Sequence, residues 1–272
     1  MRFLMSILLV HLAAGFGNAD DFEALVHTGR DGAKMPYRLT KPEGYDKAKK
    51  YPLVLILHGW GERGTDNKKQ LSQFGPAFAK PEVRKKFPAF VVVPQANGSW
   101  IQGPVFDKPI PLSPKPTKNL TLAVEIIDAL SKQEAVDADR LYLMGYSNGA
   151  CGVWELLERY PRRWAAAVPM AGAGDPAKVT AAKQVPIWAF HGANDKTIPL
   201  ERMDELTTAL RKAGGSPLYT IVAKGQHWDA KGRGLAEPNL LPWLFAQKRG
   251  RPMVPFDKIA GPKDRRPTSL EK

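Results

Sequence analysis

Residues 145–149, Gly-Tyr-Ser-Asn-Gly, have the composition of a tight turn that presents a serine nucleophile. A short apolar run at residues 140–144 precedes the turn, and apolar residues at helical spacing follow it from Val153, which is a strand–turn–helix context. Because such a turn is sharp, glycine on both sides lets the strand and the helix approach without a clash between Cβ atoms. The start of the helix also favours negative charge that develops beside the serine. We therefore predict Ser147 as a catalytic nucleophile, although the same pentapeptide also suits a plain glycine-rich start of a helix.

A serine hydroxyl is a weak nucleophile at neutral pH and needs a general base. In proteins with this kind of turn the acid and then the histidine follow the serine in the chain, whereas His27 and His58 precede Ser147. Of the later histidines, His191 ends a predicted strand and His227 lies in a loop after the last predicted strand. The base is expected in such a late loop, so we predict His227 as the base and His191 as a structural residue.

The acid of such a triad orients the histidine and stabilises its protonated form. Asp195 follows the predicted strand at residues 186–190 and lies between Ser147 and His227 in the chain. Asp229 is the nearest rival, but it stands two residues from His227 and is expected to point elsewhere. We predict Asp195 as the acid.

Acyl transfer also needs backbone N–H groups that stabilise the negative oxygen of the tetrahedral intermediate. One is predicted at Asn148, directly after the nucleophile, and the other at Trp60 in the glycine-rich loop 58–64. A phosphate cradle is excluded for this loop, because no Gly-Lys-Ser/Thr follows and no G-x-G-x-x-G occurs. Trp100 and Trp228 stand near the ends of predicted strands and are candidates for the wall of an acyl or sugar site.

The sequence indicates neither a metal nor a cofactor. It has no His-Glu-x-x-His motif and no cluster of cysteine and histidine. The only cysteine, Cys151, falls one turn into the predicted helix and is expected to be a small buried residue.

Short apolar runs alternate with helical periods along the chain, and this alternation sets the predicted fold. Residues 22–26 and 35–39 predict a leading antiparallel hairpin. Buried parallel strands are predicted at residues 53–57, 90–93, 140–144, 165–170, 186–190 and 217–222. Helices are predicted at residues 120–130, 153–160, 203–210 and 236–248. The fold class is therefore predicted as α/β, with a doubly wound, mostly parallel sheet.

The two ends of the chain differ in composition from the middle. Residues 1–19 combine Arg2, a mostly apolar stretch and small residues at positions 17–19, which is typical of a secretory signal peptide; an uncleaved membrane anchor is the alternative. Residues 20–248 are predicted as the α/β domain, and residues 249–272 as a basic, proline-rich, mobile tail. We expect a secreted or periplasmic protein.

Composition limits the possible classes of protein. The 272 residues are 43% hydrophobic, which excludes a disordered or collagenous chain, and a single cysteine excludes a disulfide scaffold. Forty Lys and Arg against 27 Asp and Glu give a formal net charge of +13. This charge favours a weak attraction to polyanions or to an anionic cell surface, with no nucleic acid as a specific partner, and it says nothing about the oligomeric state.

Four segments together resemble the α/β-hydrolase superfamily: residues 57–64, 145–149, 189–195 and 226–227. Within it the chain is similar to the bacterial dienelactone-hydrolase/carboxylesterase-like "predicted peptidase" branch, over about residues 22–247. The resemblance implies the triad of Ser147, Asp195 and His227. Many relatives have Met or Gln where this chain has Asn148. Dienelactone hydrolases proper use a cysteine nucleophile, so the serine argues against that activity.

These features favour a secreted serine hydrolase that cleaves carboxylic esters through an acyl-enzyme, with a small molecule or a sugar ester as substrate. Two alternatives stay open. One is a small serine peptidase of the prolyl-oligopeptidase type, although we expect no room in this sequence for the large gating domain that such peptidases usually carry. The other is a hydrolase-like protein without catalysis that binds a polyanion.

Overall fold

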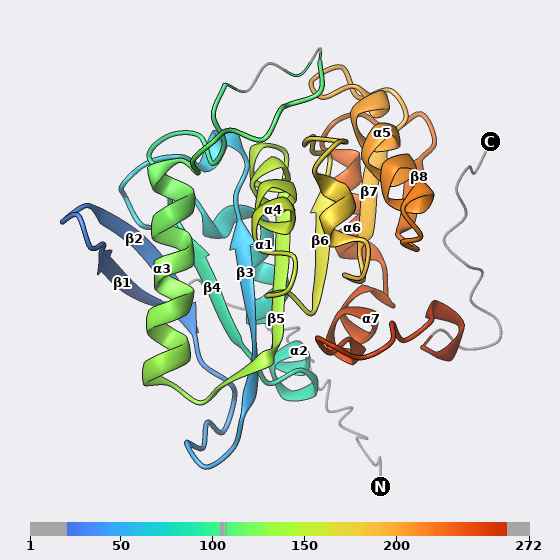
Figure 1. Ribbon diagram of the computed structural model, residues 1–272. Helices are drawn as coiled ribbons and strands as arrows, with labels where there is room; N and C mark the ends of the chain where they lie inside the picture. The colour runs from blue at the N-terminus through green and yellow to red at the C-terminus, as the bar shows by residue number, and fades with distance from the viewer. Residues whose placement is uncertain (1–20, 104–105, 107, 260–272) are drawn as a thin grey trace, which may run out of the picture.

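The structure, a computed structural model, describes residues 21–103, 106 and 108–259. The predicted signal peptide at residues 1–19 lies outside the described residues, and so does the tail from residue 260 onward. Within the described part, eight strands form one sheet with helices on both faces (Figure 1). No helix of these residues is long and apolar enough to cross a membrane.

The sheet confirms the predicted α/β class and its leading antiparallel hairpin. The strands run in the spatial order β1-β2-β4-β3-β5-β6-β7-β8. The first two strands and the β2–β4 pair are antiparallel, and all later neighbours are parallel. The strands are β1 (Glu23–Thr28), β2 (Lys34–Thr40), β3 (Tyr51–Leu57), β4 (Phe90–Pro94), β5 (Val136–Tyr146), β6 (Ala166–Met170), β7 (Trp188–Gly192) and β8 (Leu218–Val222).

The apolar runs become central strands because both of their faces are covered. All seven residues of β3 are buried, and its register with β5 sets Leu55 opposite Leu143 and Leu57 opposite Gly145. By contrast β1 forms one edge of the sheet, where Val26 is 59% exposed. The parallel register brings the carboxyl ends of β3, β5, β7 and β8 to one edge of the sheet, where active sites of such folds are built.

The helices divide between two cores, one on each face of the sheet. One core holds the apolar sides of α3 (Lys118–Gln133), α4 (Asn148–Arg159) and α5 (Leu200–Lys212). The other holds those of α1 (Leu71–Ala79), α2 (Pro81–Lys86), α6 (Asp229–Ala236) and α7 (Leu240–Ala246). Three short 3₁₀ turns also occur in the described part: η2 (Trp60–Glu62), η3 (Val179–Ala182) and η4 (Phe256–Lys258).

The described residues of the proline-rich segment 97–118 lie above the start of α4 and are attached to the domain at several points (Figure 1). The side chain of Arg159 donates to the carbonyl of Ser113 at 2.7 Å, and the Ile110 N–H donates to the carbonyl of Gly174 at 3.2 Å. At its end Thr117 caps α3 by accepting a hydrogen bond from the backbone N–H of Leu120. The described part of this segment is therefore attached to α3, to α4 and to the loop after β6.

Candidate active site

Ser147 lies in the sharp turn between β5 and α4. Its backbone has φ 56° and ψ −123°, a conformation that L-residues rarely adopt, and its N–H donates to the carbonyl of Met170 at 2.9 Å. The turn is tight because its flanking glycines pack against backbone: a Cβ on Gly145 would lie 2.5 Å from the carbonyl oxygen of Gly149, and one on Gly149 would clash with the carbonyl of Leu57. These contacts supply the physical reason for both glycines.

The serine, a histidine and an aspartate form one chain of hydrogen bonds at this turn. Ser147 Oγ and His227 Nε2 are 2.8 Å apart, and His227 Nδ1 lies 2.6 Å from Asp195 Oδ2. Since a carboxylate only accepts, Nδ1 carries the proton of a neutral ring and Nε2 offers its lone pair to the serine hydroxyl. Ser147 is 7% exposed and the His227 side chain 12%, so the serine and the histidine lie near the surface while the Asp195 side chain is fully buried.

The buried carboxylate of Asp195 is well supplied with donors. Its Oδ1 accepts hydrogen bonds from the backbone N–H groups of Thr197 and Ile198 at 2.8 and 2.9 Å. Burial raises the pKa of this carboxyl, but hydrogen bonds from His191 and His227 outweigh burial and hold the pKa well below its usual range. Asp195 therefore stays ionised at neutral pH.

His191 takes part in this network, although its sequence position indicated only a structural role. The ring is fully buried, and its Nε2–H donates to the carbonyl of Ile198 at 2.9 Å while lying 3.3 Å from Asp195 Oδ2. Its Nδ1 has no hydrogen-bond partner among the described residues. Two imidazoles thus meet one carboxylate oxygen, and no pattern in the sequence indicated the contact of His191, which lies at the end of β7.

Asp229, the rival acid, is occupied elsewhere. Its Oδ2 accepts a hydrogen bond from the backbone N–H of Gln226 at 2.7 Å, at the start of α6. It therefore shapes the loop that carries His227.

The glycine-rich loop after β3 lies directly against the serine turn. His58 is buried there: its Nδ1–H donates to the carbonyl of Gly59 at 2.7 Å, and its Nε2 accepts from the N–H of Ala96 at 3.0 Å. Burial lowers the pKa of His58 to about 4, so the ring is neutral and holds the loop as a structural group. Trp60 follows in η2, and Asn148 is the first residue of α4, where backbone N–H groups lack an intrahelical acceptor. The two predicted N–H donors thus lie on segments that touch.

The structure separates the two tryptophans that were predicted to wall the site. Trp100 is fully buried, and its indole N–H donates to the carbonyl of His58 at 2.9 Å, so it supports the loop from the core and offers no surface to a ligand. That prediction was wrong for Trp100, because its side chain packs beside Gly152 of α4 in the core on one face of the sheet. Trp228 is 63% exposed beside His227. Cys151 is buried, as expected.

Sequence reasoning missed Tyr146, the neighbour of the serine. Its ring packs against the ring of His227 with a centroid distance of 5.1 Å and is 7% exposed. Across the described residues, no group of three or more potential ligands could hold a metal ion.

Comparison with known proteins finds similar esterases. A sequence profile described as phospholipase/carboxylesterase matches residues 45–231. The protein NocK of Nocardia uniformis subsp. tsuyamanensis, which carries the name of a candidate esterase, is 28% identical over 163 residues, which are 58% of this chain and 43% of NocK. The bifunctional acetylxylan esterase/xylanase XynS20E of Neocallimastix patriciarum is 28% identical over 158 residues, which are 56% of this chain and 20% of XynS20E.

A solved structure, described as a thermostable esterase, is similar over most of the chain. It superimposes with a TM-score of 0.78 and 34% identity, covering 85% of this chain and 64% of that protein. The chain spans less than half the length of the two curated relatives.

Proposed function

This chain belongs to the phospholipase/carboxylesterase family, and from that premise we propose that it hydrolyses carboxylic esters through Ser147, His227 and Asp195. The observation that carries the proposal is the hydrogen-bonded chain at 2.8 and 2.6 Å from the serine hydroxyl to the buried aspartate. A nucleophile, a base within reach of its proton and an ionised group that orients the base are the parts that acyl transfer needs.

The proposed reaction has two halves. Ser147 Oγ attacks the carbonyl carbon of the ester while His227 Nε2 takes the hydroxyl proton, and the N–H groups of Trp60 and Asn148 stabilise the negative oxygen. Collapse of this intermediate expels the alcohol, which takes the proton from His227, and leaves an acyl group on the serine. Water then attacks the acyl-enzyme with His227 again as base, which releases the carboxylic acid and restores Ser147.

The finer assignments also belong to this proposal. We place the chain in the dienelactone-hydrolase/carboxylesterase-like "predicted peptidase" branch, with a serine esterase activity. An ester of a small molecule or a sugar, such as an acetyl or feruloyl ester, is the proposed substrate class, supported by the acetylxylan esterase name of XynS20E.

A comparison of substrates tests this function against the alternatives. We expect p-nitrophenyl acetate and an acetylated sugar to be hydrolysed well, and alanine p-nitroanilide hardly at all. The nitrogen of an amide must be protonated as it leaves, and this requires the enzyme to hold the substrate in a precise position. Ser147→Ala should lower ester hydrolysis roughly 10⁴-fold or more while the variant keeps the melting temperature of a folded protein. A fluorophosphonate probe should label the wild type at Ser147 and leave the variant unlabelled. An anilide rate that equals the ester rates would favour a peptidase, and a chain that hydrolyses nothing and takes no label would favour the polyanion-binding alternative.

A further inference from the structure

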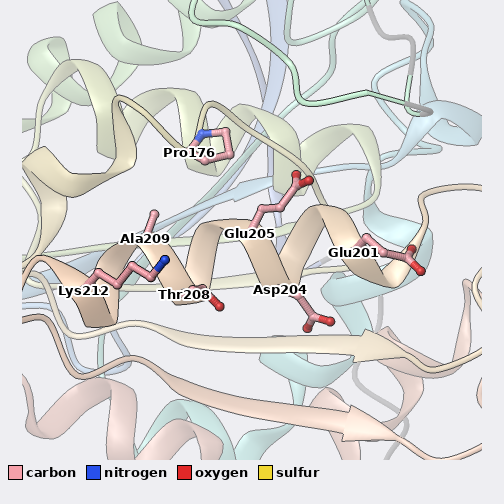
Figure 2. Close-up of a pocket in the computed structure, with 7 residues that line it drawn as sticks. All are labelled: Pro176, Glu201, Asp204, Glu205, Thr208, Ala209 and Lys212. Carbon is pink, nitrogen blue, oxygen red and sulfur yellow. The ribbon is translucent and has the colours of Figure 1, made fainter.

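Two charged side chains that make no hydrogen bond or ion pair with the described residues, Glu62 and Lys231, lie near the ring of Tyr146, which packs against the ring of His227. The hollow over α5 in Figure 2 is lined by carboxylates, but Asp204 accepts from the Tyr219 hydroxyl at 2.9 Å and Glu205 pairs with Arg202 at 2.8 Å. Asp204 and Glu205 Oε1 are thus engaged with protein partners, whereas neither Glu62 nor Lys231 forms an ion pair within the described residues, although Glu205 Oε2 also lacks a hydrogen-bond partner.

Glu62 is the acceptor of this cluster. Its Oε2 is buried without a hydrogen-bond partner among the described residues. The oxygen lies against Gly59, 3.1 Å from the position that a Cβ would take there, and Cδ1 of Tyr146 lies 3.2 Å from the same position. The carboxylate therefore sits beside the Tyr146 ring with capacity to accept a hydrogen bond from a ligand.

Lys231 is the donor of this cluster. Its Nζ lies 4.9 Å from the centroid of the Tyr146 ring, over the ring face, and the side chain is half-buried. No carboxylate of the described residues lies within 4.0 Å of this ammonium group. Burial lowers the pKa of Lys231, and the nearby charge of Glu62 opposes that effect. A half-buried cation without a close counter-charge, over the ring that packs against the proposed base, has its donors available for a ligand.

Tyr146 adds a third polar group between the other two. Its hydroxyl makes no hydrogen bond with the described residues, and burial, together with the charges of Asp195 and Glu62, raises the pKa of the phenol above its usual range. The hydroxyl therefore stays protonated and can both donate and accept.

Each of the two segments that carry these charges also presents an exposed indole. Trp60, two residues before Glu62, is 46% exposed, and the Arg63 guanidinium lies over its ring at 3.5 Å from the centroid. Trp228, which precedes the helix of Lys231, is 63% exposed. Large exposed aromatic rings beside unsatisfied polar groups are suited to a ligand that has both apolar faces and hydroxyl edges.

We propose that Glu62, Tyr146 and Lys231 form a subsite for the sugar of a carbohydrate ester, with Trp60 and Trp228 as its aromatic walls. This inference rests on the proposed ester hydrolysis at Ser147. A neutral polyol fits better than an anion, because the unpartnered carboxylate of Glu62 would repel a negative group while sugar hydroxyls can donate to it and accept from the lysine. A plain hydrocarbon chain would leave both charges unpaired as it excluded water from them.

The test compares esters that share one acyl group and one ring shape. The substrates are 6-O-acetylglucose, cyclohexylmethyl acetate, which lacks the hydroxyls, and 4-(acetoxymethyl)cyclohexanecarboxylate, which adds an anion. The variants are Glu62→Met and Lys231→Met, which keep the length of each side chain. Matched controls are Glu82→Met and Lys86→Met, both exposed on α2, which leads into the amino end of β4, opposite the edge that carries the site.

We expect the wild type to prefer the glucose ester over the cyclohexylmethyl ester in kcat/KM. Each site variant should lower that ratio roughly tenfold, mainly through KM, as expected for the loss of hydrogen bonds to a charged group, and the controls should leave it unchanged. Lys231→Arg should restore part of the ratio.

A ratio that Glu62→Met and Lys231→Met do not move, in an enzyme that still cleaves the cyclohexylmethyl ester, overturns the subsite alone. Preference for the carboxylated ester also overturns it, in favour of an anion site. A wild type that cleaves none of the three esters overturns the proposed function itself.

Discussion

At the scale of single residues, Asp195 receives hydrogen bonds from the side chains of both His191 and His227. Since its pKa in the folded protein lies below the ordinary value, the stability that this carboxylate contributes is present at neutral pH and is lost as the pH falls toward the lowered folded pKa. An acid with this environment orients and stabilises His227 and takes no proton itself.

We expect His227→Ala to lower ester hydrolysis about as much as Ser147→Ala does. Asp195→Asn should lower it equally or less, with a loss on the order of 10⁴-fold, because water and the remaining donors partly replace an orienting acid. Asp229→Asn is the matched control, since the amide oxygen can still accept from Gln226, and its activity should stay within a factor of about two. Steady-state kinetics with p-nitrophenyl acetate measure all three. A severe defect in Asp229→Asn would mean that the acid has been assigned wrongly.

The sequence predicted which residues meet at the site because chain order and turn chemistry carry that information. Ser147 could be recognised from the flanking Gly145 and Gly149, because backbone atoms occupy the space that a Cβ would need at either position. The contact of His191 with the acid and the burial of Trp100 could not be predicted, because both depend on how loops fold onto the sheet and leave no periodic pattern.

At the scale of elements, the strands could be predicted well and some helices could not. β3 and the second half of β5, residues 141–146, appear as apolar runs because both of their faces are covered. Helix α1 was missed because Gly75 and Pro76 interrupt it, yet it forms because Phe74 and Phe78 are buried one turn apart. Tertiary packing there overrides a poor local propensity.

The buried helix α4 carries an acid in an unfavourable place. Glu158 is 8% exposed, and its Oε1 accepts a hydrogen bond from the Asp175 N–H at 2.8 Å. Burial, with the nearby charges of Asp175 and Glu155, raises the pKa of Glu158 from 4.5 to about 8, although Asp175 N–H and Arg159 oppose this shift. The folded state therefore holds this proton more tightly than the unfolded state does.

Protein stability should consequently fall as the pH rises from about 4.5 to about 8, because the unfolded chain loses the Glu158 proton first. Glu158→Gln removes this ionisation. At pH 8 its free energy of unfolding should exceed that of the wild type by on the order of a few kcal/mol, so it should melt at a higher temperature, and near pH 4 the two proteins should not differ. Thermal unfolding between pH 4 and 9 measures this, with Glu82→Gln on the exposed face of α2 as control. Equal melting curves for Glu158→Gln and wild type at pH 8 would contradict the raised pKa.

At the scale of the whole molecule, two sequence features bear on where the protein acts and not on its reaction. They are the formal charge of +13 and the composition of the two ends of the chain. We propose that the protein is exported, to the periplasm or the medium, and that its basic surface adds a weak attraction to polyanions that salt weakens.

Export makes a prediction about the first residue of the mature chain. Cleavage after Ala19 should leave Asp20 at the amino terminus, within a residue or two, because small residues precede that bond. Mass spectrometry of the protein from its native compartment measures this directly. A mature chain that still begins at Met1 or Arg2 would indicate a membrane anchor.

The backbone of Ser147 has a positive φ of 56°, and this conformation implies a trade-off between protein stability and catalysis. The turn that lifts the hydroxyl toward His227 is held in a conformation that costs of the order of 1–3 kcal/mol for a residue with a side chain, and glycine would adopt it with little strain. Ser147→Gly should therefore yield a protein that melts later than the wild type and hydrolyses no ester, whereas Ser147→Ala should lose activity without that gain. The proposed nucleophile is then also a residue whose replacement by glycine would stabilise the folded protein.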